Sequence, residues 1–529
     1  MASAATTAFS DLGAIAPAHP ERVDPVRMVA FLAMCFGMFM AFLDIQVVSA
    51  SLAEIQAGLA ASSDEITWVQ TSYLMAEVVA IPLSGFLSRA LGTRMMFAIA
   101  AAGFTVASLM CGLSSSMSQM IFWRAVQGFI GGGMVPTVFA SAYIIFPRRL
   151  QPVITPMIGL VATLAPTIGP TVGGYLTDAL SWHWLFFINI VPGILVTIAA
   201  ATLIDFDRPD FSLFEHFDFV GLTFMALFLG TLEYVLEDGP RYDWFEDSTV
   251  SIAAVVSAAS AVMFFARVLT ARQPIVDLRA FLDRNFGLGS LFSFVLGIGL
   301  YGLTYLYPLY LGQIRGYNAL MVGETVFISG AAMFLSAPLV GRLMQRTDPR
   351  LMLTVGFLVV ALSNWQATYL TKDWDFWQLF LPQVLRGFGM MMAIVPITNV
   401  ALGTLAPDRL KNASGLFNLT RNLGGAVGLA GLNTILNKRI DLHVARLHDS
   451  ITFARRPAVE MLNALAARIP GSDSQNMALK QLFLMTRQQG IVMAFADVFL
   501  LLCFLFAAFS VVVWLMRRPP PVTAEVAAH

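Results

Sequence analysis

The sequence predicts an all-α polytopic membrane protein, made of two six-helix bundles with two further helices inserted between them. Its 529 residues are 57% hydrophobic and only 12% charged, whereas a soluble domain is typically about 25% charged. Long apolar runs recur along the whole chain, and one short segment occurs twice. A chain this apolar cannot cover its surface with polar groups, so we expect its solvent to be a lipid bilayer.

Fourteen apolar runs are long enough to cross a bilayer, which requires roughly 20 residues of helix. The predicted spans are 28–50, 66–87, 95–113, 119–145, 153–176, 184–204, 217–236, 249–269, 287–311, 320–341, 351–370, 376–403, 411–436 and 490–516. They define an N-terminal tail (1–27), a first six-helix bundle (28–204), a linker with helices 7 and 8 (205–286), a second bundle (287–516) that includes a long loop (438–489), and a C-terminal tail (517–529).

The distribution of Lys and Arg orients these spans. An even number of spans places both termini on one side, and cytoplasmic loops carry an excess of Lys and Arg. Only Arg241, Arg315 and Lys372 fall in the short loops of the opposite side. We therefore expect a multi-pass protein of the bacterial inner membrane with both termini in the cytoplasm, and a loop 438–489 that faces the periplasm.

An internal repeat favours two related halves. Six residues of one segment recur in the second half at a constant separation: Pro82, Leu83, Gly85, Leu87, Arg94 and Met96 match Pro338, Leu339, Gly341, Leu343, Arg350 and Met352. Parallel repeats about an axis along the membrane normal are typical of transporters, with the binding site near the midplane between the halves.

Three segments resemble motifs of a known family. GFLSRALGTR (85–94) resembles the loop between helices 2 and 3 of the major facilitator superfamily, and FWRAVQGFIGGG (122–133) resembles its fourth-helix arginine motif. LAPTIGPTVGG (164–174) resembles the fifth-helix motif of its drug/proton antiporters. With fourteen predicted spans, the chain resembles the EmrB/QacA type, and EmrB most closely. This resemblance implies the major facilitator fold and drug export driven by a proton gradient through alternating access. It also implies a periplasmic adaptor (membrane fusion) protein and an outer-membrane channel as partners.

Ionisable residues inside spans are costly and are therefore candidates for function. Asp44 in the first span and Arg124 in the fourth fall at similar depths, where each would lower the burial cost of the other. We expect this pair to couple transport to protons, with Glu77 of the second span as a further proton carrier or as a site for cationic groups. The alternatives are a static ion pair between two helices and a hydrogen-bonded carboxyl within the helix packing.

Substrate-cavity candidates come from both halves: Gln46, Glu77, Gln127, Arg386, Asn418 and Arg421. Arg386 and Arg421 lie near the middle of their spans and would favour an acidic substrate group, unless backbone carbonyls and Asn418 satisfy them. The expected substrates are therefore hydrophobic, weakly acidic compounds. Glu233 and Glu324 lie nearer the outer surface, and we expect solvated or interfacial roles for them.

The segment LAPTIGPTVGG places helix breakers inside a span, which a bilayer tolerates where neighbouring helices satisfy the backbone. Gly169 and Gly173 would let another helix approach closely, so we interpret the segment as a packing hinge; a static helix contact is the alternative. The predicted conformational and gate residues are Gly85, Arg89, Gly92, Arg94, Pro166, Gly169, Pro170, Gly173 and Gly174. Arg89 stands where the superfamily typically has aspartate, so the usual charge relay is in doubt.

Several function classes are not supported by the sequence. It has no phosphate-binding loop that ends in Lys-Ser or Lys-Thr, and its six histidines lack metal-ligand spacing. We expect no enzyme activity, no metal and no cofactor, and the net charge of −1 gives no sign of nucleic-acid binding. Two alternatives stay open: an exporter of one lipid-like or siderophore-like product, and a membrane scaffold or sensor that does not transport.

Overall fold

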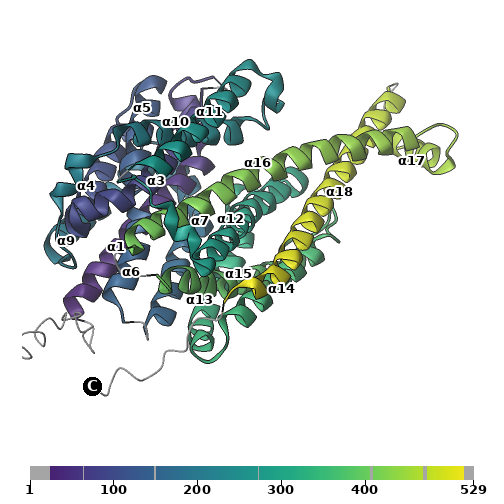
Figure 1. The fold of residues 1–529 in the computed structure, drawn as a ribbon. Helices are drawn as coiled ribbons and strands as arrows, with labels where there is room; N and C mark the ends of the chain where they lie inside the picture. The colour runs from purple at the N-terminus through teal and green to yellow at the C-terminus, as the bar shows by residue number, and fades with distance from the viewer. Residues whose placement is uncertain are drawn as a thin grey trace, which may run out of the picture.

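The computed structural model of the chain consists of helices and short connections (Figure 1). It describes residues 24–62, 65–147, 150–271, 273–405, 409–468 and 473–517, and no strand occurs within these ranges. The predicted tails at 1–27 and 517–529 lie almost entirely outside the described residues. The all-α prediction is confirmed.

The helices follow the predicted order in three groups. The N-terminal bundle contains α1 (Pro25–Ala50), α2 (Leu52–Gly58), α3 (Trp68–Ala90), α4 (Gly92–Gly112), α5 (Met117–Gly131), α6 (Met134–Ile145), α7 (Gln151–Ala179), α8 (Trp184–Phe187) and α9 (Ile190–Leu203). The inserted hairpin contains α10 (Phe219–Asp238) and α11 (Ser248–Thr270). The C-terminal bundle contains α12 (Arg284–Tyr310), α13 (Ala319–Arg346), α14 (Pro349–Ala367), α15 (Phe376–Gly403), α16 (Leu410–Ser450), α17 (Arg456–Ala466) and α18 (Ser474–Val512).

Side-chain caps mark where several helices begin. The first N–H groups of a helix have no partner within the helix. At α1 the Asp24 carboxylate accepts the Val26 N–H at 2.9 Å, and Pro25 occupies the first turn, where its missing N–H costs nothing. At α15, Asp375 and Gln378 form a reciprocal capping box.

Twelve segments of the described chain have the length and hydropathy of a membrane span. The predicted spans 153–176 and 411–436 are not among them. They lie in α7 and α16, which have 29 and 41 residues; at about 1.5 Å per residue each is longer than a hydrocarbon core of roughly 30 Å. The polytopic membrane fold is confirmed, while the count of fourteen spans and the domain boundaries stay predictions.

The bundles contact each other along two seams: α3 and α6 pack on α16, and α7 packs on α13 and α15. The inserted α10 packs on its partner α11 and also on both α3 and α16. The hairpin therefore covers the seam between α3 and α16. Its outer turn reaches both bundles, since the Trp244 indole N–H donates to the Thr434 hydroxyl at 2.9 Å and Arg241 donates to the Thr67 hydroxyl at 3.3 Å.

We call the end of the molecule where α1 begins and α18 ends the terminal face, and the opposite end the distal face (Figure 1). At the terminal face the bundles touch. A Cβ added to Gly85 of α3 would lie 2.8 Å from the Asn412 Cα of α16, and the Ser414 hydroxyl donates to the Pro136 carbonyl at 2.7 Å. The molecule is thus closed between α3 and α16 at this face.

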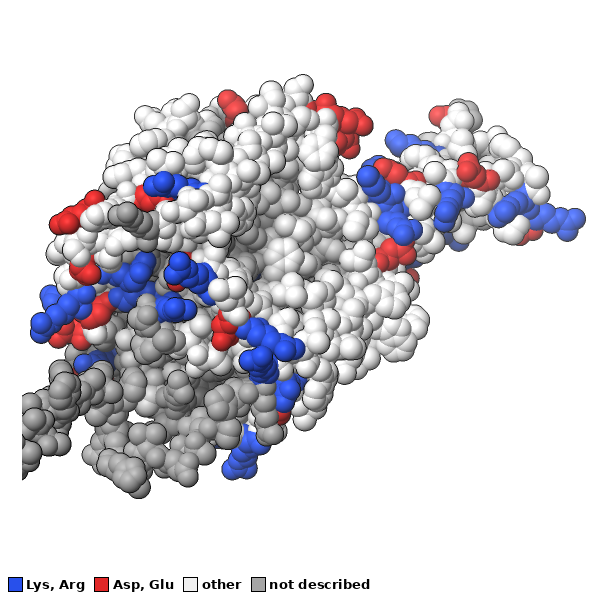
Figure 2. Space-filling model, viewed as in Figure 1, with Lys and Arg blue, Asp and Glu red and all other residues white. Residues whose placement is uncertain are grey.

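A helical arm projects from the distal face (Figure 1). The predicted loop 438–489 is mostly helical, because α16 and α18 continue beyond the bundle and α17 joins them. At the base of this distal arm, His443 Nε2 lies 2.8 Å from Asp497 Oδ2, and a Cβ on Gly490 would lie 2.6 Å from Val444 Cγ2. Figure 2 shows charged side chains on the arm, with a largely uncharged surface between it and the terminal face.

Candidate functional site

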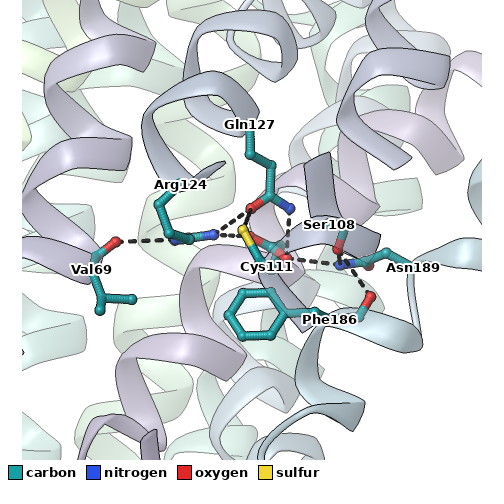
Figure 3. Close-up of polar contacts among 8 residues, drawn as sticks. Val69, Ser108, Cys111, Arg124, Gln127, Phe186 and Asn189 are labelled. Carbon is teal, nitrogen blue, oxygen red and sulfur yellow. Dashed lines mark hydrogen bonds and ion pairs between the residues drawn. The ribbon is translucent and has the colours of Figure 1, made fainter. Parts of the chain in front are cut away.

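A network of polar side chains lies inside the N-terminal bundle, and Figure 3 shows Arg124, Gln127 and Asn189 pointing toward one another within it. Asp44 of α1 is 1% exposed. Its Oδ2 accepts a hydrogen bond from Arg124 Nη1 at 2.5 Å. Its Oδ1 accepts hydrogen bonds from Gln127 Nε2 at 3.1 Å and from Asn189 Nδ2 at 2.7 Å. The predicted Asp44–Arg124 contact is therefore present in the structure, within a network that satisfies both carboxylate oxygens.

Arg124 of α5 joins this network to α3. Its Nε donates to the Val69 carbonyl at 3.1 Å and its Nη1 also donates to Gln127 Oε1 at 2.8 Å. The guanidinium carbon lies 4.3 Å from the centre of the Tyr73 ring, a cation–π distance. Nη2 has no hydrogen-bond partner among the described residues. One guanidinium donor is thus available for a different acceptor.

Two glycines of the FWRAVQGFIGGG segment bring α5 this close to α3. A Cβ on Gly128 would lie 2.3 Å from the Tyr73 carbonyl oxygen, and a Cβ on Gly132 would lie 2.9 Å from the Glu77 carbonyl oxygen. Any larger residue would push the helices apart. The glycines therefore determine how near Arg124 lies to the face of α3.

Sequence reasoning missed the outer part of this network. The Asn189 amide also donates to the Ser108 hydroxyl at 3.1 Å, and that hydroxyl donates to the Phe186 carbonyl at 2.9 Å. These bonds orient the amide toward the carboxylate. The available signal was the single polar residue in the apolar run FFINIVPG (186–193).

Val69, Tyr73 and Glu77 occupy successive turns of α3 and share one face, because residues four apart align on a helix. Arg124 donates a hydrogen bond to the Val69 carbonyl, stacks on the Tyr73 ring and lies within electrostatic range of Glu77. Glu77 lines the cavity described next. This face of α3 therefore connects the buried ion pair with the cavity.

A cavity of about 870 Å³, counting its open mouth, lies between α1, α3, α10, α12 and α16. Its walls are mainly apolar, with Phe42, Leu74, Val78 and Leu429 among the lining residues. Its charged lining residues are Glu77, Glu233, Glu237 and Arg421.

Three of the six predicted cavity residues line this cavity, namely Gln46, Glu77 and Arg421. Arg421 lies over the Phe139 ring, 5.1 Å from its centre, and donates to the Asn418 side-chain oxygen. Asn418 is 1% exposed and supports the arginine from behind. It does not itself line the cavity.

The placement of Gln127 and Arg386 differs from the prediction. Gln127 is fully buried against Asp44, because the turn of α5 that carries it packs into the bundle and not toward the midline. Arg386 is 5% exposed and donates to Thr304 at 2.8 Å and Gln383 at 3.4 Å. Of these, Thr304 lines the cavity. Arg386 therefore contacts a residue of the cavity wall but is not itself among the lining residues.

The position of Glu233 also differs from the prediction. Glu233 is 7% exposed and lines the cavity, although its position near the end of its span indicated a solvated role. The physical reason is that α10 packs against the seam between α3 and α16, which turns this face inward. Glu237, one turn further on, lines the cavity as well. Glu324 on α13 is exposed, as expected.

The LAPTIGPTVGG segment lies within α7, which stays helical over its whole length. A Cβ on Gly169 would lie 2.4 Å from Gln46 Cβ, and a Cβ on Gly173 would lie 2.9 Å from the Val47 carbonyl oxygen. These glycines therefore allow α1 to pack closely against α7. The remaining predicted hinge residues are Pro170 and Gly174, both half-buried, and Pro166, whose side chain lies outside the described part.

The other predicted gate residues lie on either side of the turn between α3 and α4, with Gly85 and Arg89 near the end of α3 and Gly92 and Arg94 at the start of α4. Gly92 has φ = 74°, a left-handed conformation that favours glycine. Arg89 donates to the Gly85 carbonyl at 3.4 Å and lies within electrostatic range of Asp277. Arg94 is exposed.

Asp207, which follows α9, links this turn to the C-terminal bundle. Its carboxylate accepts the Thr93 N–H at 3.0 Å and the Thr93 hydroxyl at 2.9 Å, and it pairs with Lys411 at the start of α16. Lys411 also donates to the Ser88 carbonyl at 2.8 Å. We call these four residues the Asp207 latch. An acidic group is therefore present at this turn although position 89 is arginine.

Within the described ranges, no three His, Cys, Asp or Glu side chains form a group that could hold a metal ion. The expected absence of a cofactor stays a prediction.

The two bundles, the central cavity and the buried ionisable pair together define a transporter of the major facilitator type. A sequence model of the Major Facilitator Superfamily matches residues 34–429, and the chain belongs to this superfamily. The colistin resistance protein EmrB of Acinetobacter baumannii is 40% identical over 471 residues, 88% of this chain and 92% of that protein. The multidrug export protein EmrB of Escherichia coli K12 is 28% identical over 494 residues, 93% and 96% of the two chains.

A solved structure, that of the human organic anion transporter MFSD10, has the same fold. It covers 91% of this chain and 100% of its own, with a TM-score of 0.56 at 13% identity. The predicted major facilitator fold and the resemblance to EmrB are confirmed.

Proposed function

We propose that the protein is a proton-coupled antiporter that exports hydrophobic, weakly acidic drugs or toxic compounds by alternating access. The observation that carries this proposal is the buried network around Asp44, which connects through one face of α3 to the cavity. The similarity to EmrB proteins named for multidrug export and colistin resistance supports drug efflux. A scaffold would have no use for such a costly arrangement.

In the proposed coupling step, a proton binds Asp44 and cancels its charge. Arg124 then loses its strongest partner, and its free Nη2 donor can move toward Glu77 on the adjacent α3 face. Because Arg124 holds the Val69 carbonyl, this exchange shifts α3 relative to α1. Helix α3 lines the cavity and meets α16, so proton binding would alter the seam between the bundles.

Arg421 is the group proposed to attract the acidic part of a substrate. It lines the cavity beside apolar side chains, which would bind the hydrophobic part. Arg386, through Thr304, would position this wall and not contact the substrate. Gln46 lines the cavity and packs on Gly169 of α7. Movement of the proposed hinge in α7 would therefore shift Gln46 in the cavity wall.

The distal arm is the proposed contact for a periplasmic adaptor (membrane fusion) protein, which would lead to an outer-membrane channel. This rests on the resemblance to EmrB-type systems and on the arm's projection beyond the bundle (Figure 1). In the proposed arrangement the protein lies in the inner membrane with its terminal face toward the cytoplasm. Deleting 451–473 should then abolish adaptor co-purification while transport into liposomes persists.

The Asp207 latch yields a prediction about closure at the terminal face. Asp207→Asn removes an ion pair between the bundles, so closure should weaken by about 1–3 kcal/mol. Ala413 is fully buried in this contact. An Ala413→Cys variant should therefore react faster with a water-soluble maleimide when Asp207→Asn is added.

Asp205→Asn is the matched control, since Asp205 is exposed two residues away and lies outside the latch. An equal labelling rate with and without Asp207→Asn would show that the latch does not hold this face closed.

Proteoliposomes with an imposed proton gradient and an internal pH dye test the proposed function. Adding a lipophilic weak acid such as decanoate should evoke proton movement opposite to substrate movement. Absence of proton flux with every hydrophobic compound tried, in protein that still binds them, would leave the scaffold or the single-product exporter as the better interpretation.

A further inference from the structure

Four charged residues line the cavity in the described part of the chain, and the inserted helix α10 contributes two of them. Glu233 and Glu237 lie one turn apart, and both line it. Helix α10 packs on α3 of one bundle and on α16 of the other. The face of α10 that carries Glu233 and Glu237 therefore borders the space between the bundles. The hairpin is thus part of the wall of the site and not only a peripheral addition.

Within the described ranges, no basic residue lies in electrostatic range of Glu233 or Glu237, and Arg124 is the basic residue in range of Glu77. Glu77 and Glu233 are 5% and 7% exposed, and neither carboxyl side chain makes a hydrogen bond or an ion pair with any residue in the described ranges. Glu233 lies within electrostatic range of both Glu237 and Glu77. A buried, unpaired carboxylate is costly, and like charges repel one another. A cation placed among these side chains would relieve both costs.

The remaining wall suits the hydrophobic part of such a cation. Tyr301 of α12 lines the cavity and lies within electrostatic range of Glu77 and Glu233. Its ring can stack on a delocalised cation, while its hydroxyl donates to Asn422 at 3.3 Å. Leu74, Val78 and Leu429 add apolar surface. The acidic groups therefore border an aromatic and aliphatic surface.

We propose that Glu233 and Glu237, together with Glu77, form a cation-binding subsite that admits amphiphilic organic cations to the cavity. This rests on the proposed export function, and it adds a second substrate class to the weak acids assigned to Arg421. Among the described residues, Arg421 is the one basic residue lining the cavity, so the site has an acidic pole on α3 and α10 and a basic pole on α16. The inserted hairpin would therefore determine which charge the exporter accepts.

Equilibrium binding to the full-length protein in lipid nanodiscs tests the subsite. The probes are radiolabelled tetraphenylphosphonium, a hydrophobic cation, and radiolabelled decanoate, a hydrophobic acid. In the double variant Glu233→Gln and Glu237→Gln, the Kd of the cation should rise about 10-fold or more, since losing a charge-assisted contact has that scale. The ratio of cation affinity to acid affinity should fall by a similar factor.

Glu324→Gln is the matched control, because it removes an exposed carboxyl on α13; its Kd for the cation should equal that of the wild type. Glu233→Asp keeps the charge and should retain most of the cation affinity, which separates a charge effect from misfolding. An unchanged cation Kd in the double variant would overturn the subsite, and so would a wild-type protein that binds the acid but not the cation. Neither result affects the proton flux evoked by weak acids, which tests the export function separately.

Discussion

Asp44→Asn is expected to abolish proton-driven accumulation of substrate, down to the level of protein-free liposomes. Asparagine carries no charge and binds no proton at physiological pH, so position 44 can no longer alternate between two states. The variant resembles the protonated protein, in which Arg124 has lost its ionic partner. Exchange of labelled for unlabelled substrate needs no proton and should continue. Uptake under a proton gradient and exchange without one, in the same proteoliposomes, are the two measurements.

Stability provides the control for this prediction. Removing one partner of a buried ion pair typically costs about 3–5 kcal/mol, so Asp44→Asn should also lower the unfolding temperature. Adding Arg124→Gln removes the unpaired charge and should restore much of that loss without restoring coupling. A double variant that regains both stability and proton-driven transport would show that the pair is merely structural.

Gly85→Val is expected to abolish transport by preventing closure at the terminal face. A Cβ at position 85 would lie 2.8 Å from the Asn412 Cα and 3.0 Å from the Lys411 carbonyl oxygen. Both are backbone atoms of α16, so no side-chain movement can make room. The bundles would have to stay apart at this face, and alternating access would stop in one state.

Spin labels on exposed residues of the two bundles can measure this separation. Arg94→Cys on α4 and Arg346→Cys on α13 are suitable sites because both side chains are exposed, and their distance should increase in Gly85→Val. Gly431→Val is the matched control, since nothing lies within 4 Å of a Cβ at that position of α16. A Gly85→Val protein that transports at the wild-type rate would contradict the role of this contact.

Much of the fold could be predicted from the sequence. Apolar runs of sufficient length determine where helices cross a bilayer, because each span satisfies its own backbone hydrogen bonds. The repeat at Pro82 and Pro338 pointed to two related bundles. The amphipathic pattern of 438–489 also indicates helical pieces, but hydropathy does not reveal that α16 and α18 continue into this segment as unbroken helices.

Part of the site was also accessible from the sequence. Asp44 and Arg124 stand out as charges in apolar spans, and matching their depths was enough to propose a contact. Asn189 was not found, because a neutral amide in an apolar run gives a weak signal. Gln127 was wrongly assigned to the cavity. The sequence shows which helix carries this residue but not which face of that helix it occupies.

The sequence by itself determined that this is a helical membrane protein of the major facilitator type, which charges its core carries, and at what depths. These follow from hydropathy and from rise per residue, which are local properties. Only the tertiary structure decided that α10 turns Glu233 and Glu237 into the cavity and that Asp207 latches onto Lys411. Both depend on contacts between segments far apart in the chain, and the packing of helix faces that creates such contacts is not written in any single segment.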